Sequence, residues 1–139
     1  MKKRQTRLMF LGVVFGVGLL FATACGAETV CTKNLISPVY PMLARQARIT
    51  GTVIVSLEVN PDGSVHSAVV SGAHKLLNRA TEDSVKKWTF CSVAESFKLK
   101  LTFVYRLEGK PEYPMTTPPK VRFHLPRVDI VARPPDAQV

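Results

Sequence analysis

The chain has 139 residues, of which 46% are hydrophobic and 21% are charged, and its formal net charge is +9. This balance excludes a disordered polyelectrolyte and a protein with many membrane spans, and the length suits one domain. Residues 1–24 hold four of the 19 basic side chains and none of the 10 acidic ones. Because so much positive charge lies at the N-terminus, the net charge is weak support for a nucleic-acid ligand.

Residues 1–24 have the pattern of a segment that directs export. Basic residues precede an uncharged apolar run over Leu8–Ala24, which ends in the small residues Ala22-Thr23-Ala24. This pattern predicts a secretory signal peptide, although a retained N-terminal membrane anchor also suits so short a run. Cys25 follows the small residues directly. It is therefore either a lipid-modified N-terminus or an ordinary cysteine near a cleavage site.

Cys31 and Cys91 predict a structural disulfide. An exported protein meets an oxidising compartment, where an even pair of cysteines is more often bridged than bound to a metal. Lipidation of Cys25, or cleavage after Ala27, leaves these two cysteines alone. No histidine stands at ligand spacing from them, so they make a poor zinc site. A loop of this length predicts a stabilisation of roughly 4 kcal/mol from the bridge.

Two segments predict helices. Residues 38–47 form the shorter one, with Pro41 in its first turn, where the missing N–H costs nothing. Its expected apolar face consists of Met42, Leu43 and Ala47. Residues 76–88 repeat apolar side chains at spacings of three and four, which is typical of a helix with one buried face. The opposite face carries charged residues, and we interpret it as a solvated surface.

Three segments predict strands, because apolar and polar side chains alternate along them. Residues 52–59 and 64–71 flank the turn signal Asn60-Pro61-Asp62-Gly63, so they predict a β-hairpin. Residues 97–107 give the cleanest alternation in the chain. The expected fold class is therefore α+β: a small single domain with an antiparallel three-stranded sheet and two helices packed on one face, in the order helix, hairpin, helix, strand.

The C-terminal tail is rich in proline. Residues 111–139 contain seven of the ten prolines, which excludes a central strand and a long helix. Residues 120–125 nevertheless alternate apolar and basic side chains, until Pro126 interrupts the run. The tail therefore predicts an extra strand only at the edge of the sheet.

Several short motifs occur in a fixed order between residues 38 and 107. They are Tyr40-Pro41, Ala44-Arg45, Gly51-Thr52-Val53, Asn60-Pro61-Asp62-Gly63, Ser71-Gly72, and then Leu77, Ala80, Val85 and Trp88-Thr89-Phe90. In this order and spacing they resemble the C-terminal domain of the TonB family, over about half of the chain. No single motif is decisive, whereas the ordered set is fairly specific.

The resemblance implies a periplasmic module of an energy transducer. In that family the C-terminal domain binds a short segment of an outer-membrane transporter, the TonB box, by strand addition, and passes on the inner-membrane proton-motive force as mechanical work. An exposed sheet edge suits this role, because its unpaired N–H and C=O groups accept an extended peptide. The expected partner-binding residues are Tyr40, Pro41, Thr102, Val104 and Arg106.

Some of the matched residues also have a purely structural interpretation. Tyr40 and Pro41 fit a helix start with an aromatic ring packed over it. Trp88 and Phe90 are expected in the core, because they end the apolar face of the second helix. The expected organisation is a signal peptide or anchor (1–24), a short linker (25–37), a TonB C-terminal-like domain (38–109) and a Pro-rich tail (110–139).

The sequence departs from a full transducer in two ways. Its apolar run over residues 8–24 lacks the serine and histidine of the family's anchor. Residues 28–37, when extended, span at most roughly 35 Å, which is too short for an inner-membrane protein to touch the outer membrane. The alternative function is therefore a structural envelope domain, lipidated or not, whose sheet edge is covered by its own tail and which transduces no energy.

Nothing in the sequence indicates an enzyme. Its three histidines, His66, His74 and His124, are isolated, and no serine or cysteine lies in a nucleophile context. No glycine-rich phosphate loop or metal-ligand spacing occurs, so no cofactor and no metal are expected. The strand lysines lack neighbouring aromatic residues on which bases would stack, which argues against nucleic acid.

The expected location is the periplasm or cell envelope of a Gram-negative bacterium. The expected partner is an outer-membrane transporter or another envelope protein, and the N-terminal segment or a lipid would provide contact with the membrane. A homodimer formed through the free sheet edge is a further option.

Overall fold

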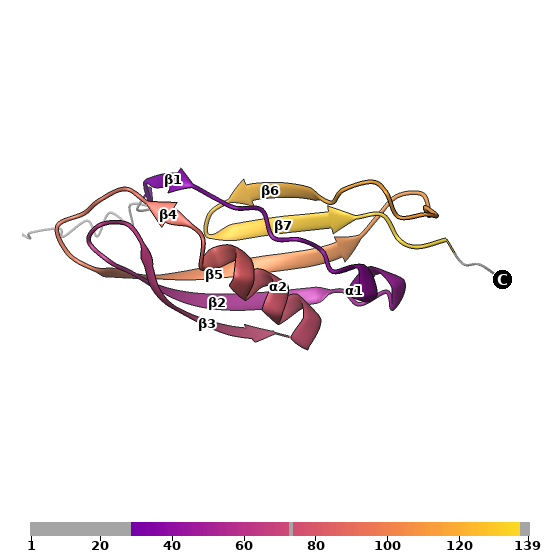
Figure 1. Ribbon diagram of the computed structural model, residues 1–139, viewed down its shortest axis with the longest axis horizontal. Helices are drawn as coiled ribbons and strands as arrows, with labels where there is room; N and C mark the ends of the chain where they lie inside the picture. Colours follow the sequence, from indigo (N-terminus) through magenta and orange to yellow (C-terminus); the bar gives the residue numbers. More distant parts are fainter. Residues whose placement is uncertain (1–28, 73, 137–139) are drawn as a thin grey trace, which may run out of the picture.

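A five-stranded mixed sheet forms the body of the molecule (Figure 1). The computed structural model describes residues 29–72 and 74–136, so the expectations for residues 1–24 and Cys25 lie outside the described residues. The strands of this sheet are β2 (Gly51–Val59), β3 (Val65–Gly72), β5 (Phe97–Leu107), β6 (Lys120–His124) and β7 (Arg127–Ala132). Their order across the sheet is β3-β2-β5-β7-β6.

The pairing within this sheet is antiparallel except at one place. Strand β2 pairs antiparallel with both β3 and β5, and β6 pairs antiparallel with β7. Strand β7 instead lies parallel to β5, with Thr102 opposite Arg127 and Leu107 opposite Ala132. The tail thus runs away from the sheet after β5, returns as β6, and turns once more to place β7 against β5.

The remaining elements are a small second sheet and two helices. Strands β1 (Thr32–Asn34) and β4 (Thr89–Phe90) form an antiparallel two-stranded sheet. The helices are α1 (Met42–Gln46) and α2 (Lys75–Val85), and α2 lies against β2 and β3 (Figure 1). Neither helix is long and apolar enough to cross a membrane, and the described residues contain no other.

The expected three-stranded antiparallel sheet with two helices is wrong, because the Pro-rich tail adds two strands to one sheet and the chain forms a second one. The prolines lie beside the tail strands and not within them. Pro119 precedes β6, Pro126 lies between β6 and β7, and Pro134 follows β7. Each therefore removes a backbone donor where the ladder does not need it. Strand β7 is not at an edge, since β5 and β6 flank it.

The first helix differs from the expectation in both length and orientation. The backbone of Pro41 is extended, with ψ of 136°, so the helix begins only at Met42 and has 5 residues. Ala44 and Arg45 face the interior, whereas Met42 and Leu43 remain 54% and 65% exposed. The expected apolar face of Met42, Leu43 and Ala47 is therefore not the buried face.

The hairpin is confirmed. Strands β2 and β3 pair from Val53 opposite Gly72 to Val59 opposite Val65. In the turn, Gly63 has φ of +90°, and a Cβ atom there would lie 1.9 Å from the carbonyl oxygen of Phe90. Only glycine meets both conditions, because it alone lacks the side chain that would clash.

One face of the large sheet carries the core and the other is open to solvent. Both helices contribute to the same core cluster, which includes the inward-facing side chains of β2, β5 and β7. Trp88 is 1% exposed and lies against Phe103 and Phe123, with ring centroids 5.7 and 5.9 Å away. Phe90 is fully buried, so the expectation that both residues belong to the core is confirmed.

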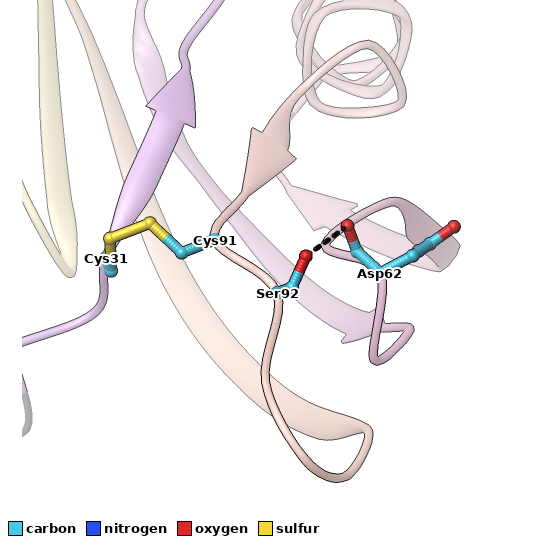
Figure 2. The surroundings of a disulfide bond; sticks show 4 residues. All are labelled: Cys31, Asp62, Cys91 and Ser92. Carbon is cyan, nitrogen blue, oxygen red and sulfur yellow. Dashed lines mark hydrogen bonds between the residues drawn. A yellow bond between two sulfur atoms is a disulfide. The ribbon is translucent and has the colours of Figure 1, made fainter.

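The expected disulfide is present between Cys31 and Cys91, whose Cα atoms are 5.4 Å apart (Figure 2). Cys31 lies just before β1 and Cys91 just after β4, and the Cys91 N–H donates to the Cys31 carbonyl at 3.0 Å. Figure 2 also shows the Ser92 hydroxyl directed at the carbonyl oxygen of Asp62. The bridge thus joins the N-terminal strand to the segment that contacts the hairpin turn.

Candidate functional site

Three of the expected partner-binding residues lie on β5, which is an interior strand. Thr102, Val104 and Arg106 are paired with β7 on one side, and Thr102 and Val104 are also paired with β2 on the other. Their side chains are on the open face of the sheet, where Arg106 is exposed. The backbone edge expected at these residues is therefore occupied by the chain's own strand β7.

Tyr40 and Pro41 lie at the start of α1, away from those three residues in the chain. Tyr40 is 3% exposed; its ring meets the ring of Tyr105 edge-on at 5.3 Å, and its hydroxyl donates to the carbonyl of Ile49. Burial raises the pKa of the Tyr40 phenol to about 12, against the smaller opposing effect of the Arg45 charge. Its contacts match the interpretation of an aromatic ring packed over a helix start.

The free backbone edges of the large sheet belong to β3 and β6. Strand β6 pairs with β7 alone within the described part of the chain. Val121 and Phe123 of β6 pack against the core, so Lys120, Arg122 and His124 alternate onto the open face. The two faces of this edge strand therefore differ in chemistry: one is apolar and the other is cationic.

An apolar groove of about 420 Å³ lies beside β6 on the core side. It is lined by Ser37, Pro38, Val39, Pro118, Pro119 and Val121, which come from the segment before α1 and from the tail. Val39 is 69% exposed, and the exposed apolar side chains Met42 and Leu43 follow it on α1. Exposed apolar side chains grouped beside a groove are typical of a protein-binding surface.

A basic pocket of about 390 Å³ lies at the other side of β6, near the ends of β5 and β7. Its charged lining residues are Arg106, Glu108, Lys110, Lys120, Arg122 and Arg133. Five cations thus face one carboxylate. Glu108 pairs with Arg106 at 3.3 Å, which leaves the remaining four cations without a carboxylate within 4.0 Å among the described residues.

The walls of the basic pocket are held by hydrogen bonds from outside it. The buried guanidinium of Arg45 donates to the carbonyl oxygens of Arg133 and Thr117. One carboxylate oxygen of Glu112 accepts from the N–H and hydroxyl groups of both Thr116 and Thr117. These hydrogen bonds, chiefly those from Thr117, lower the pKa of Glu112 to about 2.

Residues 36–107 match the family described as "Gram-negative bacterial TonB protein C-terminal". This chain belongs to the TonB C-terminal family. Its relatives include "Protein TonB" of Klebsiella pneumoniae, 28% identical over 76 residues, which cover 53% of this chain and 31% of that protein. "Protein TonB" of Xanthomonas campestris pv. campestris (strain B100) is 35% identical over 63 residues, covering 44% and 28%. The match thus spans about a third or less of each relative's length.

The boundary of the TonB family match divides the candidate site. The matched region ends at Leu107, which is also the last residue of β5. The groove combines family residues 37–39 with tail residues 118–121, and nearly all of the basic pocket lies beyond residue 107. In this TonB-family domain, the chemistry beside β6 is therefore supplied mainly by the tail.

The groove and the pocket were missed by the sequence analysis. The tail residues that line them are scattered among prolines, and no spacing in the sequence joins them to residues 37–39. The one available signal was the poor helical spacing of Met42, Leu43 and Ala47, which do not form a continuous stripe. Within residues 29–72 and 74–136, no group of three or more histidine, cysteine, aspartate or glutamate side chains is placed to hold a metal.

Proposed function

We propose that this TonB-family domain binds an extended segment of another cell-envelope protein by adding it as a strand to the free edge of β6. The observation that carries the proposal is the position of this unpaired edge between the apolar groove and the basic pocket. An extended peptide at a sheet edge gains backbone hydrogen bonds, and pockets beside the edge select its side chains.

The outer edge of β6 is favoured over β5 because β7 is part of the core. Val128 and Ile130 are fully buried and Ala132 is 3% exposed. A peptide that displaced β7 would have to replace the burial of these side chains, worth about 1.5–3 kcal/mol for each of the two larger ones. Contacts of a partner with Thr102, Val104 and Arg106 are then made through side chains on the open face. Tyr40 and Pro41 support the exposed surface of Val39 and α1 from below.

The proposed partner is an outer-membrane transporter, and the proposed setting is the periplasm of a Gram-negative bacterium. The family membership and the export pattern of residues 1–24 support both. In this role the domain contributes the partner-binding step of energy-dependent transport. Its short linker requires either a second protein to span the periplasm or release of the chain by cleavage of residues 1–24.

A second candidate function is a structural envelope domain that carries no partner. The pairing of β7 with β5 favours it, because the chain's own tail occupies the interior edge that a peptide would otherwise use. The two candidates differ in one respect: the structural domain leaves the edge of β6 without a ligand in the cell.

Site-specific photo-crosslinking in the native host distinguishes them. A photoreactive residue replaces His124 on β6 in the full chain, and His66, which is also exposed and lies on the opposite edge strand β3, provides the matched control. We expect crosslinks from position 124, mapped by mass spectrometry to a periplasmic segment of an outer-membrane transporter. Crosslinks from position 66 alone, or from neither position, contradict the proposal.

A further inference from the structure

We propose that the segment bound at β6 alternates apolar and acidic residues, and that the basic pocket selects the acidic ones. This inference rests on the proposed function and adds the chemistry of the ligand. It starts from the pleat of β6: Val121 lines the apolar groove, whereas its neighbours Lys120 and Arg122 line the basic pocket. A strand added beside β6 follows the same pleat, so its side chains alternate between the two surfaces.

Charge complementarity identifies the residues on the basic side. Arg106 on β5, Val131 on β7 and Lys120 on β6 lie in one row across the sheet, with Val131 between the two cations. Arg106 already pairs with Glu108 at 3.3 Å and approaches Asp129 at 3.7 Å. Lys120 and Arg122, the two cations nearest the free edge in strand order, have no such partner among the described residues. Carboxylates of an added strand would be placed opposite them.

The pocket is built to hold this geometry without a ligand. Arg45 fixes the carbonyl groups of Arg133 and Thr117, and Glu112 fixes Thr116 and Thr117. A rigid wall reduces the ordering that binding would require. Arginine side chains also bind carboxylates through two parallel hydrogen bonds, which favours a ligand with carboxylate groups.

The positions of the two surfaces argue against a membrane as the ligand. The apolar groove includes the core side of β6, whereas the cations of the pocket alternate onto the open face of the sheet. A flat bilayer touches one face of a domain at a time, so it would not use both surfaces together. A strand at the edge between them does use both. The pocket also lies mainly outside the family match, so this selectivity belongs to the tail of this chain.

Binding of three synthetic peptides by the full exported chain tests the inference. Each peptide is about as long as β6 and has valine at alternate positions, with glutamate, glutamine or lysine between them. Isothermal titration calorimetry at low salt gives the affinities, and amide NMR shifts locate the binding edge. We expect the glutamate peptide to bind about tenfold more tightly than the glutamine peptide, at β6, and the lysine peptide to bind most weakly.

A pair of matched double variants assigns the effect to the pocket. Lys120→Ser with Arg122→Ser removes two pocket cations, and Lys98→Ser with Lys100→Ser removes the same charge from the open face of β5 outside the pocket. We expect the first pair to remove the preference for glutamate over glutamine. The second pair is expected to preserve it. Equal loss in both pairs would reduce the effect to net charge and overturn the assignment.

The remaining outcomes separate the two proposals. If the glutamine peptide binds β6 as tightly as the glutamate peptide, strand addition stands and the selection of acidic residues is overturned. If none of the peptides shifts the amides of β6, the proposed function fails and the inference falls with it. If vesicles of phosphatidylglycerol bind through Lys120 and Arg122 while the peptides do not, the pocket belongs to a lipid headgroup and the inference is wrong.

Discussion

The guanidinium of Arg45 donates two hydrogen bonds to the carbonyl oxygen of Arg133, 88 residues further along the chain, at 3.3 and 3.1 Å. A third goes to the carbonyl of Thr117 at 3.3 Å. Arg45 is only 4% exposed, so carbonyl dipoles replace the water that its charge would otherwise need. This one side chain therefore joins the family region of the domain to the tail that builds the basic pocket.

Replacing Arg45→Met is expected to lower the free energy of unfolding by about 2–4 kcal/mol. The two carbonyl oxygens lose their donors, and the apolar side chain supplies none in return. Urea unfolding measures the loss, and hydrogen exchange is expected to rise most along β7. Arg79→Met changes the same residue type at an exposed position on α2 and serves as the control. Equal stability of the two variants would show that the Arg45 contacts do not stabilise the tail.

Truncation of the chain after Gly109 is expected to unfold the domain or to lower its melting temperature strongly. It removes β6 and β7, and with them the buried side chains of Val128 and Ile130. Their burial is worth several kcal/mol, which is a large part of the roughly 5–15 kcal/mol that stabilises a small protein. Circular dichroism during thermal unfolding measures the effect, and a chain that ends at Asp136 is the control. A truncated chain as stable as the control would make β7 a removable cover of β5.

Loss of the Cys31–Cys91 disulfide is expected to lower the free energy of unfolding by about 2–4 kcal/mol. The bridge closes a loop with a sequence separation of 60, so its main effect is to restrict the unfolded chain. The double variant Cys31→Ser with Cys91→Ser, compared with the reduced and oxidised natural chain, measures this in urea. Agreement between the double variant and the reduced chain is the internal check. An oxidised chain no more stable than the reduced one would contradict the prediction.

Glu112 predicts a dependence of stability on pH in the acidic range. Its pKa falls from 4.5 to about 2 in the folded protein, because Thr116 and Thr117 donate to the ionised carboxylate. A lowered pKa favours folding above the unfolded value, so its contribution is full above about pH 4.5 and is lost as the pH falls toward 2. The difference in unfolding free energy between the natural chain and Glu112→Gln should therefore shrink between these two pH values.

The control for the pH prediction is Glu95→Gln, which alters an exposed carboxylate in the segment before β5. This variant should follow the pH dependence of the natural chain. A Glu112→Gln variant whose stability changes with pH as steeply as that of the natural chain would show that the threonine contacts do not favour the ionised form.

Local patterns in the sequence predicted the elements whose contacts lie close together in the chain. The hairpin of β2 and β3 follows from alternation around a strong turn signal, and α2 follows from its helical spacing. The expected end of α2 at Trp88 is three residues too late, since the helix ends at Val85. Trp88 is still buried, because its ring reaches back to the core and its indole N–H donates to the carbonyl of Ile36.

The strand β7 could not be assigned from the tail alone. Its alternation of Val128, Ile130 and Ala132 lies between Pro126 and Pro134, and prolines usually exclude an interior strand. Both prolines lie just outside the ladder, and the parallel pairing with β5 depends on a return of the chain through β6. No short-range rule describes such a return, because its favourable contacts form only when the whole tail is in place.

The sequence by itself determined the family, the hairpin, the second helix and the cysteine pair, since each depends on residue types at short spacing or on ordered motifs. The tertiary structure alone decided which edge of the sheet is free. It placed β7 on β5, moved the open edge to β6 and brought residues 37–39 beside 118–121. The physical reason is the burial of apolar side chains from both halves of the chain in one core, which fixes long-range neighbours that local patterns do not encode.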